Sequence, residues 1–523
     1  MDKFDFKMRD LFFKRKKEKP TSIHKRWVSP GAALRALFSD FMIVLQLMIM
    51  AAIYAFLAYK FRVFWYVSIA LTCLAGVYVA IFERDRQSKV SWLILFVASC
   101  GCGYIIYFLA SKQICYGYDR RRFAKIAERA ESYFDTYTLE NASPAVEKDC
   151  GYMYEAGGYV PYTGTDLKYY SNARALFDNM ATRIEKAEKF VFMEFFIVAD
   201  SVLLDRLISI FRRKSAEGVE IRLLCDDVGC AGMITTTTMK RLKEAGVKVK
   251  VFKKLLTLFN FGLNFRDHRK IVVIDGQTGY VGGINVADSY TNERRMEGLW
   301  KDAGLRLDGA AVDGLTLTFL RQWEFATKEW QNYGVYLNRY ERTENNAHVV
   351  PYAGGPEIKE ALCRGVYKSV ISGAQEKLYV MTPYFIPDSE LFDMIKEKAK
   401  AGADVRLVLP AVPDYPFIYR VTRFNAERLI KYGVKIYYMR GEFVHSKVML
   451  TENCATVGSV NVDMRAFYQE YDNGVYTDDE ALMQDVSEDF ARAFALVNPA
   501  ARRKWNPLGA VVDCVLRIVS PLM

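Results

Sequence analysis

Two histidines of this chain begin the same pattern of a lysine two residues on and an acid five residues later. The two copies are His268, Lys270 and Asp275, and His445, Lys447 and Glu452. A histidine and a lysine two residues apart on a strand point to one face, so an imidazole and an ammonium group can meet one anion. The acid falls on the opposite face, which predicts a structural carboxylate. Because the chain has only four histidines, the recurrence is a strong signal.

Each pattern is followed by a glycine-rich element that ends in an asparagine, at Asn285 and at Asn461. If the two clusters face each other, two imidazoles, two ammonium groups and two amides surround one phosphate. One imidazole can then attack phosphorus while the other protonates the leaving oxygen. The lysines and amides offset the phosphoryl charge, so we expect neither a metal nor another cofactor. The alternative is two structural histidines with coincidental neighbours.

The elements that position these clusters form an internal repeat. Beyond about residue 145, short β-rich runs alternate with helical ones, which is typical of α/β layering. The order at 189–225 returns at 377–408, with a matching segment at 218–224 and 402–408. Two large copies predict an α/β fold of two similar lobes, 146–345 and 346–523, that face each other and share a site.

The region before the lobes is basic and then apolar. A basic tail, 1–36, precedes three uncharged apolar runs within 37–111, at about 41–59, 63–82 and 90–110. Each run is long enough for a helix to cross roughly 30 Å of hydrocarbon, so we expect transmembrane helices and a multi-pass protein of the cell membrane. A connecting helical segment, 112–145, follows. Basic residues flank the runs on both sides, a distribution that three full crossings do not satisfy.

The chain resembles the phospholipase D superfamily, and within it the bacterial cardiolipin synthases. The stretches that carry the resemblance are 264–276 (NFRDHRKIVVIDG), 382–388 (TPYFIPD), 458–465 (GSVNVDMR) and 520–522 (SPL). The resemblance implies two phospholipase D-like lobes with central mixed sheets flanked by helices, preceded by membrane helices. The apolar run at 508–519 predicts a C-terminal helix that either closes the second lobe or lies on the bilayer. Glu452 departs from the family pattern, which has aspartate there.

The resemblance also implies a reaction. One phosphatidylglycerol is attacked at phosphorus, glycerol leaves, and the phosphatidyl group passes from a histidine to a second phosphatidylglycerol, which gives cardiolipin. The family places the nucleophile at His268 and the general acid and base at His445, although the two motifs are nearly symmetric and could support the reverse. It also places histidine-orienting carboxylates at Asp302 and Glu470. The alternative for each is a surface acid.

The net charge of +11 requires an anionic partner, and charge alone does not choose between nucleic acid and anionic lipid. The apolar runs favour a bilayer over nucleic acid as the partner, and the resemblance implies that the phospholipid substrate is phosphatidylglycerol. A phospholipase D-type hydrolase or another headgroup-exchange enzyme would carry the same motifs. A non-catalytic membrane scaffold would tolerate loss of a motif histidine or lysine, and none is lost. The ten cysteines show no spacing typical of disulfides or zinc.

Overall fold

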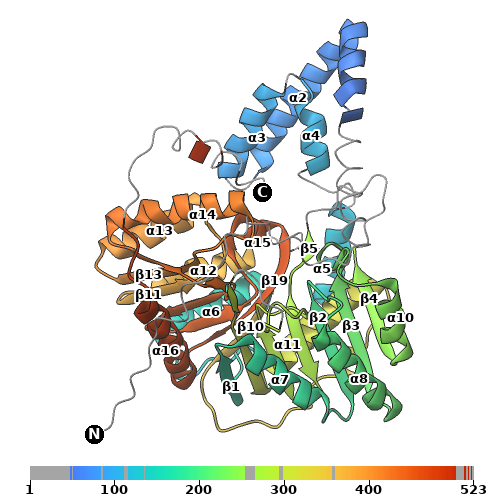
Figure 1. Ribbon diagram of the computed structural model, residues 1–523, viewed down its shortest axis with the longest axis vertical. Coiled ribbons are helices and arrows are strands. Elements are labelled where there is room, and N and C mark those ends of the chain that lie inside the picture. Colours follow the sequence, from blue (N-terminus) through green and yellow to red (C-terminus); the bar gives the residue numbers. More distant parts are fainter. Residues whose placement is uncertain are drawn as a thin grey trace, which may run out of the picture.

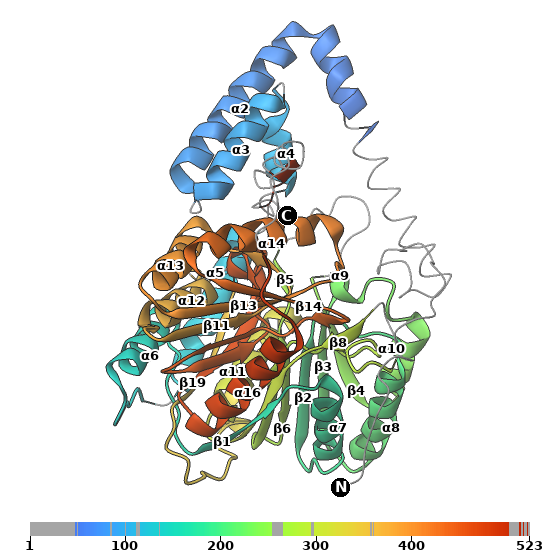
Figure 2. The same ribbon diagram turned by 60° about the vertical axis from the view of Figure 1, so that its left-hand side comes forward.

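The computed structural model describes residues 48–49, 51–83, 86–99, 101–110, 116–134, 136–253, 265–293, 298–355, 358, 360–501, 512–513, 516 and 520. Two α/β lobes lie side by side, and a group of helices projects from one end of them (Figures 1 and 2).

The first lobe is built on a seven-stranded mixed sheet of order β1-β9-β7-β6-β2-β3-β4. Its strands are β1 (Thr165–Tyr170), β2 (Phe190–Phe195), β3 (Glu220–Asp226), β4 (Val247–Phe252), β6 (Lys270–Ile274), β7 (Thr278–Gly282) and β9 (Gly304–Gly309). The strands β2, β3 and β4 are parallel, and the others pair antiparallel. The helices of this lobe are α7 (Ala173–Ile184), α8 (Val202–Ala216), α9 (Asp227–Cys230), α10 (Thr236–Glu244) and α11 (Val312–Thr327), with a 3₁₀ turn at Tyr333–Val335.

The second lobe repeats this sheet in the order β10-β19-β17-β16-β11-β13-β14. Its strands are β10 (Val349–Gly354), β11 (Lys377–Met381), β13 (Asp404–Pro410), β14 (Lys435–Met439), β16 (Val448–Thr451), β17 (Ala455–Gly458) and β19 (Glu470–Thr477). Its helices are α12 (Leu362–Gly373), α13 (Ser389–Lys400), α14 (Pro416–Leu429), α15 (Met464–Tyr468) and α16 (Glu480–Leu496), with a 3₁₀ turn at Ile430–Tyr432. The predicted α/β architecture with two similar lobes and mixed sheets is confirmed.

The two lobes share one hydrophobic core. Residues of the first sheet alternate, so that Val191 and Met193 face α7 and α8 while Phe190 and Phe192 face α11. The core around α11 continues without interruption into one face of the second sheet and into α16. The opposite face of the second sheet packs against α12 and α13. The lobes are therefore layers of a single packed body, not separate globules.

Two short strand pairs cross between the lobes. Strand β5 (Arg266–Asp267) of the first lobe pairs in parallel with the start of β19, and β15 (Glu442–Val444) of the second lobe pairs in parallel with β8 (Leu299–Lys301). A further pair, β12 (Phe385–Ile386) with β18 (Val462–Asp463), lies within the second lobe. Each crossing pair ends at a motif histidine, so the pairs fix both histidines at the boundary between the lobes.

The N-terminal helices differ from the three predicted spans. In the described part of the chain one helix, α2 (Arg62–Phe82), is long and apolar enough to cross a membrane, and it matches the second run. Residues 51–60 are helical, but most of the rest of the first run, 41–59, lies outside the described residues. Three membrane-crossing helices are therefore not established by the described residues.

The third run, 90–110, is not one helix. It divides into α3 (Arg86–Ala98) and α4 (Gly103–Ala110), about 20 and 12 Å long and so too short to cross a bilayer. The chain turns between them at Gly101, whose φ of +94° is left-handed, and the hydroxyl of Thr72 on α2 donates to the Gly101 carbonyl at 2.7 Å. Trp92 of α3 packs edge-on against Tyr107 of α4. The prediction that the run 90–110 forms one continuous membrane-crossing helix is therefore wrong.

The segment before the first lobe is shared between both lobes. Helix α5 (Tyr116–Glu131) packs on α11 of the first lobe, but α6 (Pro144–Gly157) packs on α12 of the second. The contact between α6 and α12 is close, since a Cβ at Gly365 would lie 1.7 Å from the hydroxyl oxygen of Tyr152. The spatial lobes thus differ from the sequence boundary at residue 146. The C-terminal apolar run is described only at 512–513 and 516, which are helical, and at Ser520.

A buried ion pair ties the end of β3 to β5. Both Asp226 carboxylate oxygens lie within 3.1 Å of Arg266 Nε, and the carboxylate also accepts from the backbone N–H of Asp267 at 3.0 Å. We expect Asp226→Ala to destabilise the fold by about 3–5 kcal/mol, because it leaves the buried guanidinium without its counter-charge. Chemical denaturation of the purified protein in detergent measures this. The exposed acid Asp205, replaced by alanine, serves as the control, and equal effects of the two changes would contradict the prediction.

Candidate active site

A cavity of about 480 Å³ lies between the lobes and is lined by residues of both. His268, His445, Asn285 and Asn461 all line it. The two histidines, far apart in the sequence, are 8% and 7% exposed. The lysines of both motifs are also buried, and each donates a hydrogen bond to the carbonyl of its own histidine. The histidines and asparagines of both predicted clusters therefore line one cavity, whereas the two lysines are not among its lining residues.

The acid that contacts His445 comes from the other lobe. His445 Nδ1 lies 2.7 Å from Oδ2 of Asp302, which is fully buried. The backbone N–H of His445 donates to the carbonyl of Lys301, the residue before that acid, at 2.8 Å. A neutral imidazole that donates from Nδ1 keeps Nε2 unprotonated and able to act as a nucleophile or base.

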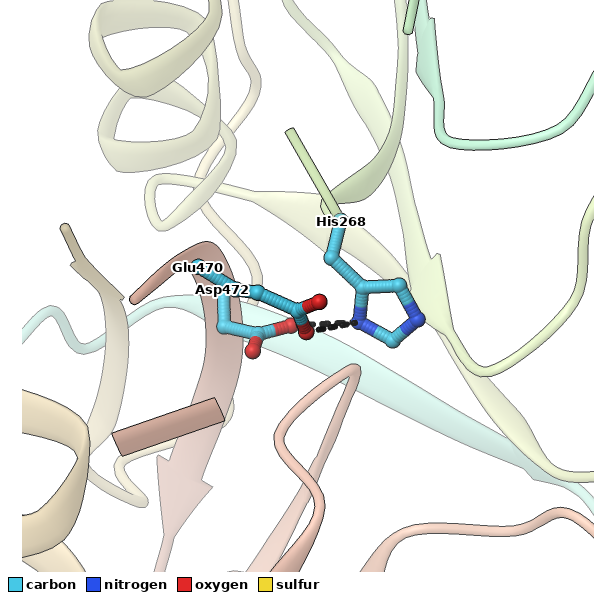
Figure 3. Close-up of side chains that lie close together, drawn as sticks. All are labelled: His268, Glu470 and Asp472. Atoms are coloured by element: carbon cyan, nitrogen blue, oxygen red, sulfur yellow. Dashed lines mark hydrogen bonds and ion pairs between the residues drawn. The ribbon is translucent and has the colours of Figure 1, made fainter. Parts of the chain in front are cut away.

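The partner of His268 is Asp472, which the sequence analysis missed. His268 Nδ1 lies 2.9 Å from Asp472 Oδ1 and 3.7 Å from Glu470 Oε2 (Figure 3). The second ring nitrogen points away from both carboxylates. Glu470 is instead held at 2.6 Å by Nε of Arg465. The hydrogen bond to His268 therefore comes from Asp472, while Glu470 lies beside the ring and its role in orienting the histidine stays a prediction.

The repeat explains both the error and the signal that would have corrected it. Gly282 pairs with Gly304 on β7 and β9, as Gly458 pairs with Gly474 on β17 and β19. Asp302 lies two residues before the first strand partner, and Asp472 lies two residues before the second. Aligning the two Asp-x-Gly elements identifies Asp472, whereas Glu470 corresponds to Trp300. The backbone N–H of His268 donates to the carbonyl of Tyr471, repeating the His445 arrangement.

Burial and the neighbouring lysines hold both imidazoles neutral. Burial, followed by the charge of Lys447, lowers the pKa of His445 to about 3, and burial with Lys270 lowers the pKa of His268 well below its usual value. Burial also lowers the pKa of Lys270 to about 8 and that of Lys447 to about 7. An anion that enters the cavity opposes these shifts, because it stabilises every protonated group around it.

The two orienting acids have different environments. Burial raises the pKa of Asp472 to about 6. Burial also acts to raise the pKa of Asp302, but His445 and Lys447 outweigh it and lower that pKa below its usual value. Ser459 donates to Asp472 Oδ1 at 2.5 Å, while Gly283 stands at the equivalent place beside Asp302. Asp302 is thus the more firmly ionised partner.

The motif acids Asp275 and Glu452 lie away from the cavity and bind backbone. Asp275 accepts hydrogen bonds from the N–H groups of 188, 189 and 190, each at 2.8 Å. Glu452 accepts from Gln375 at 2.5 Å and from Lys377 at 3.2 Å. These contacts fix the start of the central strand in each lobe, which is a structural task. The longer glutamate reaches the same backbone groups as the aspartate.

The two motif asparagines are not equivalent. Asn285 accepts from the Ile197 N–H at 3.0 Å and donates to the Tyr290 hydroxyl at 2.7 Å. Asn461 is 5% exposed, and its Oδ1 has no hydrogen-bond partner among the described residues. The first amide therefore braces the site, while the second retains hydrogen-bonding capacity.

One group of side chains at the site has the spacing of metal ligands. Ligand atoms of His268, Glu470 and Asp472 lie within 4.8 Å of one another. The positive guanidinium of Arg465 already binds Glu470, and Ser459 already donates to Asp472. A cation placed there would meet that positive charge and would displace the imidazole proton. The donor set thus fits an oriented imidazole better than a metal ion.

The chain is similar to known proteins in sequence and in fold. The family model described as "Cardiolipin synthase, PLD-like domain" matches residues 180–304 and 367–494. The chain is 28% identical over 456 residues to a cardiolipin synthase of Clostridium perfringens, covering 84% of this chain and 95% of that protein. It is 28% identical over 481 residues to cardiolipin synthase 2 of Staphylococcus epidermidis, covering 87% and 97%. The crystal structure of phosphatidylserine synthase from Haemophilus influenzae covers 72% of this chain and 100% of its own, with a TM-score of 0.56 and 12% identity, which shows a common fold.

The two His–Asp contacts generate a prediction. We expect Asp302→Asn and Asp472→Asn each to keep the fold and lose about 10²–10⁴-fold in kcat, because an amide can stabilise the wrong imidazole tautomer. Glu470→Gln, which leaves both close contacts intact, should cost much less. Turnover of phospholipid vesicles, together with the thermal unfolding midpoint, measures both effects. Full activity in either aspartate variant would show that its contact does not orient the ring.

The lysines predict how rate depends on pH. A lysine is positive below its pKa, so the charge that attracts a phosphate is lost as pH rises through about 7 for Lys447 and about 8 for Lys270. We expect kcat/KM to fall across this range. The fall in kcat should occur at a higher pH than the fall in kcat/KM, since bound phosphate stabilises both ammonium groups. Initial rates on vesicles of constant surface charge measure it, and coincident limbs would contradict the assignment.

Proposed function

The chain belongs to the phospholipase D superfamily, and from that premise we propose that it is a cardiolipin synthase of the cell membrane. It is a phosphatidyltransferase, as its curated relatives are. The observation that carries the proposal is the cavity in which both histidines are neutral and held from behind by acids of the opposite lobe. The substrates are two molecules of phosphatidylglycerol, and the products are cardiolipin and glycerol.

The first half-reaction breaks the bond between phosphorus and the glycerol headgroup. Nε2 of His268 attacks phosphorus, and the leaving glycerol oxygen takes a proton from His445. Lys270 and Lys447 balance the charge on the phosphoryl oxygens. His445 becomes protonated only with phosphate in the cavity, because the empty site holds it neutral.

In the second half-reaction, His445 removes the proton from a terminal hydroxyl of the second phosphatidylglycerol. That oxygen attacks phosphorus, the bond to His268 breaks, and cardiolipin forms with His268 restored. The more firmly ionised Asp302 lies behind His445, where it stabilises an imidazolium better than Asp472 does behind His268. This difference supports His445 as the proton carrier and His268 as the nucleophile.

The apolar helices provide the membrane anchor in this proposal. Helix α2 spans the bilayer, whereas the described helices α3 and α4 are too short to cross it. The basic residues before 41 and after 110 favour the same side of the membrane for both flanks. Buried cysteines such as Cys225 and Cys454, which form no disulfide in the described part of the chain, suit a reducing compartment, so we place the lobes on the cytoplasmic face.

The experiment that tests the function is product analysis. Membranes containing the protein are incubated with labelled phosphatidylglycerol and a chelator, and the lipids are separated. We expect cardiolipin and free glycerol from the wild type and no turnover from His268→Ala, because the covalent intermediate cannot form. His445→Ala should slow release of glycerol or breakdown of the adduct. Phosphatidic acid as the only product would instead identify a hydrolase, and a phospholipid adduct on His445 would reverse the two roles.

A further inference from the structure

Each lobe contributes one histidine, one lysine and one asparagine to the proposed phosphate site, so these groups occur twice. The headgroup alcohol, in contrast, lies on only one side of phosphorus at a time. A group that recognises the alcohol therefore has no need of a copy in both lobes. One acid of the cavity is such a single copy. Asp463 stands two residues after Asn461, and Ala287 stands two residues after the equivalent Asn285.

Asp463 combines burial with an uncommitted oxygen. The residue is 8% exposed and lines the cavity. Its Oδ1 accepts from the N–H of Ala466 at 2.8 Å and so caps α15. Among the described residues the second oxygen makes no hydrogen bond, and the residue lines the cavity. That oxygen is therefore able to accept a hydrogen bond from a ligand in the cavity.

Two more acceptors line the same cavity and also come from the second lobe. Asn461 has an Oδ1 that is buried and without a hydrogen-bond partner among the described side chains. Asp414 is oriented by the hydroxyl of Tyr384, which donates to its Oδ2, and by the N–H of Tyr415, which donates to Oδ1 at 2.7 Å. The three residues present oxygen acceptors to a space that also holds both histidines.

We propose that Asp463, Asn461 and Asp414 form a subsite for the hydroxyl groups of a polyol, the glycerol headgroup that leaves or attacks. The proposal rests on the proposed function and adds what selects the alcohol. Burial, followed by the charge of Glu470, raises the pKa of Asp463 to about 7. Near neutral pH both the protonated and the ionised form of this carboxyl group are therefore present. The protonated form can donate a hydrogen bond to an alcohol hydroxyl group, and both forms can accept one.

This subsite separates the choice of alcohol from the attack on phosphorus. A site that pairs buried polar groups with a substrate hydroxyl rejects an alcohol lacking it, because those groups then remain unpaired. Ethanol and glycerol offer the same reacting hydroxyl but differ in the others. The enzyme should therefore prefer glycerol, and that preference should depend on Asp463.

The experiment uses a phosphatidyl donor with a p-nitrophenol leaving group, in detergent micelles with equal concentrations of glycerol and ethanol. Release of p-nitrophenol reports attack by His268, and the ratio of phosphatidylglycerol to phosphatidylethanol reports selection of the alcohol. We expect Asp463→Asn to lower that ratio by about tenfold or more while p-nitrophenol release changes far less. Asparagine retains the helix cap, so the fold should be preserved. Asp463→Ser, which also keeps a capping oxygen, and Asp414→Asn test the subsite independently.

Asp393→Asn is the matched control, because its side chain is 60% exposed on α13, outside this cavity. An unchanged ratio in Asp463→Asn, or an equal loss of p-nitrophenol release and of the ratio, overturns the subsite. Failure of the proposed function is distinct. A wild type that makes no cardiolipin from phosphatidylglycerol, yet selects glycerol through Asp463, is a headgroup-exchange enzyme with the polyol subsite intact.

Discussion

Each motif histidine depends on a strand of the other lobe. The pairing of β5 with β19 places the N–H of His268 on the carbonyl of Tyr471, one residue before Asp472, and the pairing of β15 with β8 repeats this for His445 and Asp302. The position of each imidazole ring relative to its carboxylate is therefore set by backbone hydrogen bonds between strands and not by flexible side chains. Because the pairs are reciprocal, neither lobe contains a complete histidine–acid unit by itself.

The reciprocity is exact in topology but not in chemistry. Ser459 donates a hydrogen bond to Asp472, whereas Gly283 at the equivalent place has no side chain to donate one to Asp302. The amide oxygen of Asn285 accepts a hydrogen bond from the backbone, whereas that of Asn461 has no partner among the described residues. In the proposed mechanism the two half-reactions have opposite proton requirements, which suit two such unequal imidazoles. The fold thus supplies a nearly symmetric frame, and single differences within it give the two histidines different surroundings.

The sequence predicted which histidines and asparagines share the cavity, because the motif spacing is local and recurs. The internal repeat alone predicted that His268 and His445 share a site. Glu470 was chosen over Asp472 because the two Asp-x-Gly elements of the repeat, at 302–304 and 472–474, were not aligned. The alignment identifies the acid of each lobe, but which histidine that acid contacts depends on the pairing of strands between the lobes. The break of the third apolar run at Gly101 could not be predicted from hydropathy. Apolar content measures the preference of a segment for lipid and not the backbone angles of one glycine. Helix α6 was assigned to the first lobe because sequence adjacency says nothing about which core receives a helix.

The position of α6 has a consequence for how the chain is made. The helix leaves the ribosome before either lobe, but its packing surface on α12 is about 200 residues further along. At roughly 5–20 residues per second, translation keeps its apolar face without that partner for on the order of 10–40 s. During that interval the first sheet can form, while α6 still lacks the α12 surface on which it packs. The nascent second lobe is thus completed by a segment synthesised before the first, which makes the order of translation and the order of assembly different.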